Sequence, residues 1–192
     1  MMVGKTIAGM GDGKSKSVVD KIAASRRQLD TAIWLWFNHG DIVSIHTLTD
    51  AAFGILLDLY HVRKWKRPIP FDDEGNPGGA EPKKWRKKVK EAGAFGKHAR
   101  SDHDLTYEYN HIFMEAYLVC AVSAHSRLEK PTPDCLRFIF WFWFDLQYPR
   151  LVKPFPVTFE SRDVEQLKKI SRTKFLQIFG SKFIGNPPKP DL

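Results

Sequence analysis

Two adjacent segments with helical periodicity, joined by one short turn, constrain the fold of this chain most strongly. In residues 27–39 and 42–60 the apolar positions recur every three or four residues, which places them on one face of a helix. Gly40 can end the first helix in the left-handed conformation, and Asp41 can cap the second, with Ser44 at its third position. Helices with so short a connection pack as antiparallel neighbours, so we expect a helical hairpin at the centre of the fold.

The rest of the chain predicts further helices and no sheet. Ser17, Asp104 and Thr132 are placed to cap the first, fourth and fifth helices. Beyond the hairpin, the predicted helices are residues 82–94, 105–127, 133–147 and 160–179. We therefore expect an all-α fold, a single-domain bundle of five or six helices. The chain is expected to divide into a mobile tail, this helical domain and an extended tail, at residues 1–16, 17–180 and 181–192.

The segment from Cys135 to Gln147 is aromatic on every side of the predicted helix. Its large rings are Phe138, Phe140, Trp141, Phe142, Trp143 and Phe144. A helix that is apolar all round is either central to its bundle or buried in a partner. So many rings favour a homodimer formed through residues 135–147. The apolar run at 138–144 is shorter than the roughly 20 residues of a membrane-spanning helix, and no transmembrane span is expected.

The cysteines and the N-terminal segment indicate which cofactors and which cellular location to expect. Cys120 and Cys135 lie in apolar helical patterns, which are typical of buried reduced thiols rather than of a disulfide framework or zinc site. Residues 1–17 lack the apolar core of a secretory signal, so we expect a cytoplasmic protein. The GDGKS sequence at 11–15 is not a complete phosphate-binding loop, because Ala8 stands where the first glycine belongs. Neither a metal nor a cofactor is predicted.

Positive charge is concentrated in one part of the chain. The net charge is +8, and residues 61–100 alone contribute +7, with Trp65 and Trp85 among the basic residues. Such a concentration suits nucleic acid, an anionic membrane surface or an acidic protein partner, although a solvated helix surface has the same composition. The candidate nucleic-acid-binding residues are Arg63, Lys64, Lys66, Arg67, Lys83, Lys84, Trp85, Arg86, Lys87, Lys88, Lys90 and Arg100.

Two short polar segments are candidates for acid–base chemistry or phosphate contact. The first contains Lys97, His98, Arg100, Asp102 and His103 within seven residues. Its alternative interpretation is a cluster that caps the following helix. The two histidines are five residues apart, and this spacing does not favour a metal site.

The second polar segment is the hairpin turn, where Asp41 and His46 lie near one helix start. Capping together with a packed imidazole explains this pair, and an anion site at the helix N-terminus is the alternative.

The same segments carry a resemblance to an uncharacterised bacterial family. The sequences RQLDTAIWLWFNHGDIVSIHTL and AFGKHARSDHD resemble its "GD-x-VSIHTL" and "FFKHA-x-x-D" motifs, and the resemblance covers about residues 27–151. The positions that match are Asp41, Ser44, His46, Thr47, Lys97, His98 and Asp102. A shared role for the two motifs implies that the hairpin turn lies close to residues 97–103. This chain has Ala94, Phe95 and Gly96 where the family has Asn-Phe-Phe.

The paired helices also resemble, more weakly, the HEPN superfamily of helical nucleotide- and RNA-associated domains. Its active ribonucleases use an Arg, four to six residues, and then a His. Lys97 and His103 have this spacing, but Lys replaces Arg, which keeps the charge and loses the planar bidentate geometry.

Three function hypotheses follow from these patterns. The leading one is a non-catalytic helical module that binds nucleic acid through residues 61–100. The alternative is a HEPN-like ribonuclease or another phosphate-directed hydrolase, with His98 and His103 transferring protons and Lys97 or Arg100 binding phosphate. The third is a structural or interaction subunit.

Overall fold

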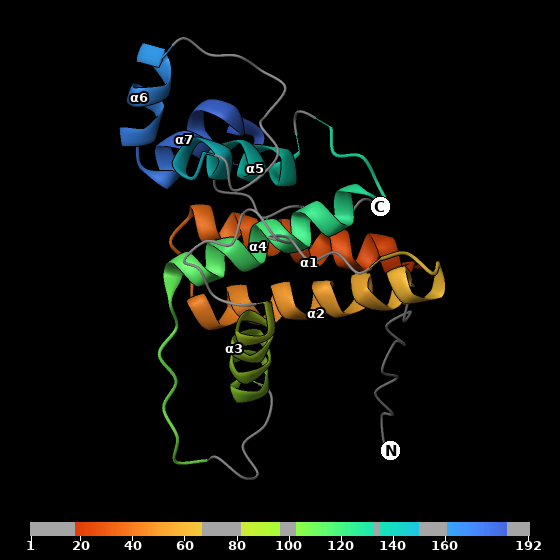
Figure 1. Cartoon of the computed structure of the whole chain (residues 1–192). Coiled ribbons are helices and arrows are strands. Elements are labelled where there is room, and N and C mark those ends of the chain that lie inside the picture. The colour runs from red at the N-terminus through yellow and green to blue at the C-terminus, as the bar shows by residue number, and fades with distance from the viewer. Residues whose placement is uncertain (1–17, 67–81, 97–102, 133–134, 150–160, 184–192) are drawn as a thin grey trace, which may run out of the picture.

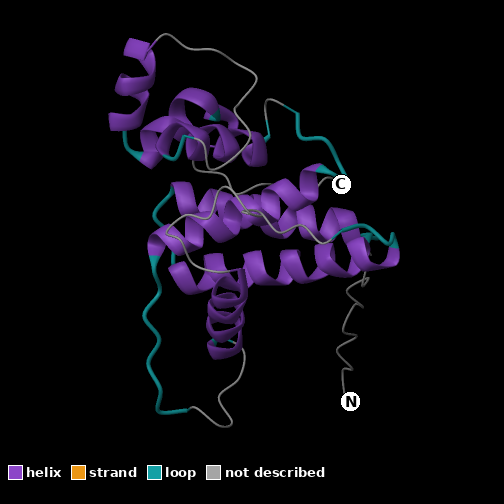
Figure 2. Cartoon of the chain, viewed as in Figure 1, coloured by secondary structure: helices purple, strands orange, loops and turns teal. Residues whose placement is uncertain are grey.

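The computed structural model describes residues 18–66, 82–96, 103–132, 135–149 and 161–183, and this part of the chain folds into helices without any strand (Figure 2). The helices are α1 (Lys21–Phe37), α2 (Ile42–Val62), α3 (Pro82–Phe95), α4 (His111–Ser126), α5 (Leu136–Gln147), α6 (Ser161–Lys169) and α7 (Arg172–Phe179), followed by a 3₁₀ turn, η1 (Ser181–Phe183). The predicted all-α fold is confirmed, with more helices than the five or six expected. Most of both predicted tails lies outside the described residues.

The hairpin of α1 and α2 forms where the sequence predicts it. Asp41 caps α2, since its carboxylate accepts hydrogen bonds from the backbone N–H of Ser44 (2.7 Å) and from the Ser44 hydroxyl (2.8 Å). The start of α1 differs from the prediction: Asp20 caps it by accepting from Ala23 N (2.7 Å), and Val18 is non-helical and 98% exposed. An Asp carboxylate at this position satisfies a helix-end N–H, so the helix begins there.

The end of α1 corrects one detail of the predicted turn. His39, not Gly40, has the left-handed backbone, with φ of 55°. The N–H groups of His39 and Gly40 donate to Trp36 O (3.4 Å) and Leu35 O (2.8 Å), the paired hydrogen bonds of a Schellman motif. Gly40 is needed for a different reason, because a Cβ there would lie 2.9 Å from Leu35 Cδ2.

The start of α4 was predicted six residues too early. Asn110, rather than Asp104, caps this helix by accepting from Phe113 N (3.0 Å). In the segment before it, Tyr107 and Tyr109 are half-buried while Leu105 is 65% exposed. The tyrosine rings pack on each other and on Phe95 of α3. Alternate burial of this kind belongs to an extended segment, so aromatic packing overrides the helical pattern.

Helix α5 lies between two groups of helices, which explains its apolar character. It contacts α1 and α4 on one side and α6 and α7 on the other (Figure 1). Phe140 packs edge-on to Trp36 at 5.1 Å, and Phe142 contacts Phe175 at 5.4 Å between ring centroids. Seven of its apolar side chains are buried within the single chain, and they are Leu136, Ile139, Phe140, Phe142, Trp143, Phe144 and Leu146. The homodimer remains a prediction, now resting only on the partly exposed Phe138 and Trp141.

The last predicted helix is two helices. Ser171 interrupts it by accepting a hydrogen bond from Lys174 N (3.2 Å), and this starts α7 afresh. Gly180 ends α7, with its N–H donating to Leu176 O (2.7 Å). Thr173 donates to Phe37 O (3.1 Å), which fixes the start of α7 beside the end of α1. A polar cap and one inter-helix hydrogen bond therefore outweigh the continuous apolar period.

Both cysteines are free thiols, as predicted, with Cys120 buried in α4 and Cys135 half-buried. Cys135, rather than Thr132, occupies the N-cap position of α5 and makes no side-chain cap hydrogen bond. Among the described helices, α2 is long and apolar enough to cross a membrane by length and composition. Core helices of soluble proteins meet the same criterion, and α2 packs against α1, α3 and α4.

Candidate functional site

The C-terminal end of α2 presents an aromatic side chain on a strained backbone. Lys64 has a positive φ of 55°, a conformation that costs a non-glycine residue about 1 kcal/mol or more. Its N–H donates to His61 O (3.0 Å) and that of Trp65 to Tyr60 O (2.9 Å), a second Schellman motif. The motif turns Trp65 back onto Tyr60, with ring centroids 5.3 Å apart and planes at 89°. Trp65 nevertheless stays 36% exposed.

Two guanidinium groups lie over this indole. The Cζ atoms of Arg63 and Arg127 are 5.0 and 5.4 Å from the Trp65 ring centre, and Arg127 also lies 5.5 Å from that of Tyr60. Arg127 follows the last turn of α4, which is held to α2 because the Tyr60 hydroxyl donates to Ala124 O (2.8 Å). We call the surface formed by Arg63, Lys64, Trp65, Lys66 and Arg127 the Trp65 surface.

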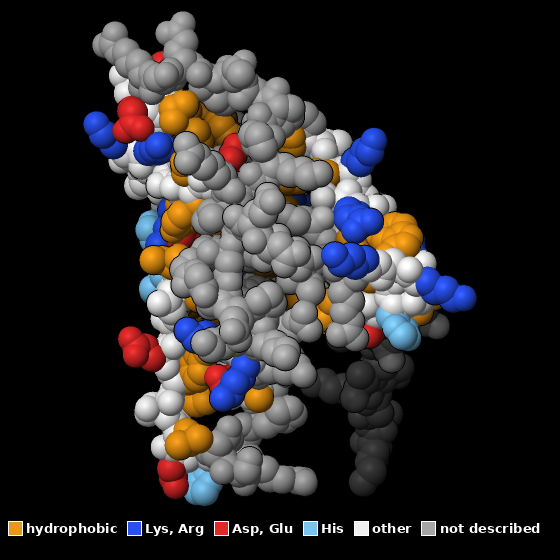
Figure 3. Space-filling view, in the orientation of Figure 1, with side chains coloured by type: hydrophobic (Ala, Val, Ile, Leu, Met, Phe, Trp, Pro, Cys, Tyr) orange, Lys and Arg blue, Asp and Glu red, His pale blue; other side chains and the backbone are white. Residues whose placement is uncertain are grey.

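The Trp65 surface is cationic. Neither Arg63 nor Arg127 forms an ion pair with another described residue. Burial raises the pKa of the Tyr60 phenol, although Arg127 and Arg63 oppose that effect, so the phenol is neutral and supplies no compensating charge. Figure 3 shows Lys and Arg side chains gathered beside an exposed hydrophobic side chain at the end of the molecule where α2 and α4 finish.

The structure divides the basic face predicted over residues 61–100. Helix α3 lies against the first half of α2, where a Cβ on Gly93 would meet Asp50 and one on Gly96 would meet Thr47 (Figure 1). Along α2, Thr47 and Arg63 are separated by about 24 Å, given the rise of an α-helix. The described lysines of α3 therefore form a separate surface from the Trp65 surface.

The other predicted basic residues are described only in part. Lys87 and Lys88 are exposed, and the Lys87 ammonium lies 3.6 Å from the Glu91 carboxylate. Five candidate residues of α3 have side chains that the structure does not describe, namely Lys83, Lys84, Trp85, Arg86 and Lys90. Arg67 and Arg100 also lie outside the described residues. Arg127 was not predicted as a member of the surface, because it is isolated in the sequence and reaches Trp65 only through the packing of α4 on α2.

The polar motif at the hairpin turn has a structural explanation. Asp41 and Ser44 form the α2 cap, and the Ser44 hydroxyl and N–H hydrogen bonds lower the pKa of the Asp41 carboxyl. His46 is 2% exposed and packs against Tyr109 (5.6 Å) and Tyr117 (5.4 Å). Capping with a packed imidazole, one of the two interpretations of this motif, therefore describes what these residues do.

The second polar motif begins beside the first. A Cβ on Gly96 would lie 3.6 Å from Thr47 Oγ1 and 3.8 Å from the Tyr109 hydroxyl, so the segment after α3 starts against the hairpin. Of the candidate catalytic residues, Lys97 and His98 lie outside the described residues, as do Arg100 and Asp102. His103 is described: its side chain is 72% exposed and its Nε2 lies 3.0 Å from Asp104 Oδ2. No group of His, Cys, Asp or Glu suited to a metal occurs in the described part of the chain.

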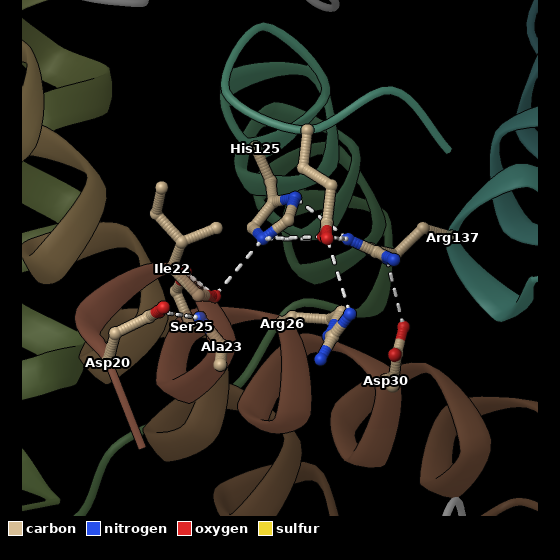
Figure 4. Close-up of polar contacts among 9 residues, drawn as sticks. Asp20, Ile22, Ala23, Ser25, Arg26, Asp30, His125 and Arg137 are labelled. Carbon is tan, nitrogen blue, oxygen red and sulfur yellow. Dashed lines mark hydrogen bonds and ion pairs between the residues drawn. The ribbon is translucent and has the colours of Figure 1, made fainter. Parts of the chain in front are cut away.

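A buried polar network joins α1, α4 and α5, and the sequence interpretation missed it. Arg137 Nε lies 3.1 Å from Asp30 Oδ1, and its NH1 donates to Glu129 Oε2 at 3.2 Å (Figure 4). Arg26 NH1 donates to the other Glu129 oxygen, also at 3.2 Å. Two guanidinium groups thus meet two carboxylates around a central histidine.

That histidine, His125, is fully buried and neutral. Burial, reinforced by the Arg137 charge, lowers its pKa to about 4. Its Nδ1 accepts from Arg137 NH1 (2.8 Å), so the proton is on Nε2, which faces Ile22 O at 3.3 Å. A single Arg within the apolar run LRFIF was the sequence signal for this network, because a buried guanidinium requires carboxylate or carbonyl partners.

Comparison with known proteins found no family model, curated protein or solved structure that matches this chain. The resemblances to the uncharacterised bacterial family and to the HEPN superfamily therefore stay predictions.

Proposed function

We propose that this protein binds single-stranded nucleic acid through the Trp65 surface. The observation that carries the proposal is a partly exposed indole accompanied by two guanidinium groups that have no carboxylate partner among the described residues. Arg and Lys neutralise phosphates, and unstacked bases pack on indole rings or on guanidinium planes. The Trp65 surface combines both kinds of group.

The backbone of Lys64 gives further support. Cations near the C-terminal ends of α2 and α4 also stabilise the helix dipoles, which would explain positive charge at this place. A dipole does not require Lys at a left-handed position, where glycine costs less, nor an exposed tryptophan. Strain of this kind is more often retained where the side chain has a binding role.

The test is fluorescence anisotropy of a labelled oligouridylate with the untagged full chain over a series of salt concentrations. We expect affinity to fall as salt rises, because each phosphate contact releases counterions. Arg127→Ala should reduce the slope of log K against log salt by about 0.7, the value for one contact to a single strand. Trp65→Leu should weaken binding by about 5- to 150-fold with an unchanged slope, since it removes stacking and no charge.

Lys87→Ala is the matched control, because it removes one positive charge from α3, away from the Trp65 surface. It should leave the slope and the affinity nearly unchanged. Binding that does not respond to salt, or that falls equally with Arg127→Ala and Lys87→Ala, contradicts the proposal.

A further inference from the structure

A small cavity lies at the opposite end of α2 from the Trp65 surface, where the hairpin turns. Its volume is about 100 Å³. The lining residues come from α1, α2, α4, α7 and the hairpin turn, and they are Trp36, His39, Gly40, Ile42, Ile45, His111, Met114 and Arg172. Because the Thr173 hydroxyl holds α7 against Phe37 O, the cavity is a fixed feature of the helix packing.

Positively charged and imidazole groups from three separate elements line this cavity. Arg172 lies with its Cζ 4.5 Å from the ring centre of Trp36, and it has no ion pair with a described residue. His39 and His111 are exposed beside it, on the hairpin turn and on α4. Ile42, His111 and Arg172 are also the first residues of α2, α4 and α7, so the starts of three helices, capped by Asp41, Asn110 and Ser171, border the cavity.

His39, beside the cavity, has a left-handed backbone conformation. Its φ of 55° is unfavourable for a side chain with a Cβ, and glycine would relieve that strain. His39 is nevertheless among the residues that line the cavity. Lys64 is the other non-glycine residue with a positive φ in the described part of the chain, and it belongs to the Trp65 surface.

The charge behind the cavity limits which anion fits. Glu115 is 6% exposed and accepts a hydrogen bond from the Tyr148 hydroxyl (2.7 Å). It interacts electrostatically with Arg172 and His111, and burial raises its pKa. A carboxylate that interacts electrostatically with Arg172 offsets part of the guanidinium charge. It therefore favours a monoanion over a doubly charged phosphate.

The size and the apolar walls identify the remainder of the ligand. A volume of about 100 Å³ lies below the roughly 300–1,000 Å³ of typical ligand pockets, so we expect a small ligand. Trp36, Ile45 and Met114 give the cavity an apolar side. Arg172 is suited to a carboxylate because its planar guanidinium can donate two parallel hydrogen bonds.

We infer that this cavity binds a small organic monocarboxylate, with the carboxylate on Arg172, His39 and His111 and a short apolar chain against Trp36 and Met114. The inference is independent of nucleic-acid binding, since it concerns the other end of α2 and a different set of residues.

The experiment is saturation-transfer NMR of sodium butyrate with the full chain, with inorganic phosphate as a competing probe. Butyrate should bind the wild-type protein, and Arg172→Met should weaken it by about ten- to a hundredfold, because the charged hydrogen-bond donor is lost while the apolar stem on Trp36 is kept. Lys174→Ala removes an exposed cation from the same helix and should leave butyrate binding unchanged. Thermal unfolding of Arg172→Met establishes that it is folded.

His39→Gly keeps the test decisive if Arg172→Met does not fold. Glycine relieves the positive φ, so this variant should be at least as stable as the wild type and yet bind butyrate several-fold more weakly. Absence of butyrate binding to the wild type overturns the inference. Displacement of butyrate by equimolar phosphate, or unchanged binding in His39→Gly and Arg172→Met, overturns it as well.

Discussion

Single residues at the two ends of α2 adopt conformations that their own chemistry does not favour. His39 and Lys64 each occupy the position after a helix C-cap where glycine is usual. Both are polar: His39 lines the cavity, and Lys64 is the exposed residue that precedes Trp65. A residue kept against its conformational preference is best explained by what its side chain does, because glycine would make the same turn at a lower free-energy cost.

Substitution of Lys64 tests whether its side chain has a binding role. Lys64→Gly should raise the free energy of unfolding by about 1 kcal/mol, measured by urea denaturation, because the left-handed backbone no longer strains a Cβ. The same change should weaken oligouridylate binding, because one cation leaves the Trp65 surface. Lys64→Ala separates the effects: it should lose binding to the same extent without the gain in stability. A Lys64→Gly protein that binds as tightly as the wild type would show that the lysine charge is not used.

At the scale of helices, polar capping residues determine where the helices begin, which hydrophobic periodicity alone does not show. The hairpin was predictable because Asp41 gives an unambiguous cap between two apolar stripes. The starts of α4 and α7 were not, since Asn110 and Ser171 compete with other possible caps and only packing selects among them. Periodicity therefore located the helices, and the tertiary contacts located several of their ends.

The candidate sites were less predictable than the helices, for the same reason. Arg63, Lys64 and Lys66 could be identified from local charge, but Arg127 is distant in sequence and joins them only in the folded protein. The cavity at the hairpin turn gathers Arg172 from α7 and His111 from α4, residues with no common sequence pattern. Spatial convergence of isolated residues is visible only in the structure.

The network around Arg137 makes a prediction about how α5 is fixed to α1. Arg137→Met should lower the free energy of unfolding by about 3 kcal/mol, because Asp30 and part of Glu129 lose their buried cation. Arg26→Met is the control: its side chain is 26% exposed and its loss should cost less than about 1 kcal/mol. Urea denaturation of both variants gives the comparison. Equal costs would mean that burial of Arg137 does not determine the strength of the network.

The whole molecule is organised along α2, which connects two different kinds of surface. Its C-terminal end carries exposed cations and an indole, and its N-terminal end borders a small cavity with mixed polar and apolar walls. The helices α1 and α4 run beside it and hold both ends in place (Figure 1). Ligands at the two ends would be separated by about the 31 Å length of α2, and we expect them to bind without direct contact.

Acid stability of the folded chain should depend on His125. Its folded pKa of about 4 lies below the ordinary imidazole value of 6.5, so between these values the unfolded chain binds a proton that the folded chain does not. Stability from this group is therefore complete above about pH 6.5 and is lost as the pH falls to 4, by roughly 3 kcal/mol. His125→Gln cannot titrate, and its amide oxygen can still accept from Arg137.

The stability difference between wild type and His125→Gln should consequently shrink as urea denaturation is repeated from pH 7 down to pH 4. Taking the difference removes the contributions of other groups, including Glu115, whose raised pKa acts in the opposite direction. A difference that stays constant over this range would mean that His125 takes up its proton at the same pH in the folded and the unfolded chain. In that case Arg137 would have to turn its guanidinium away from the imidazole, and the network that joins α1, α4 and α5 would need a different arrangement of charges.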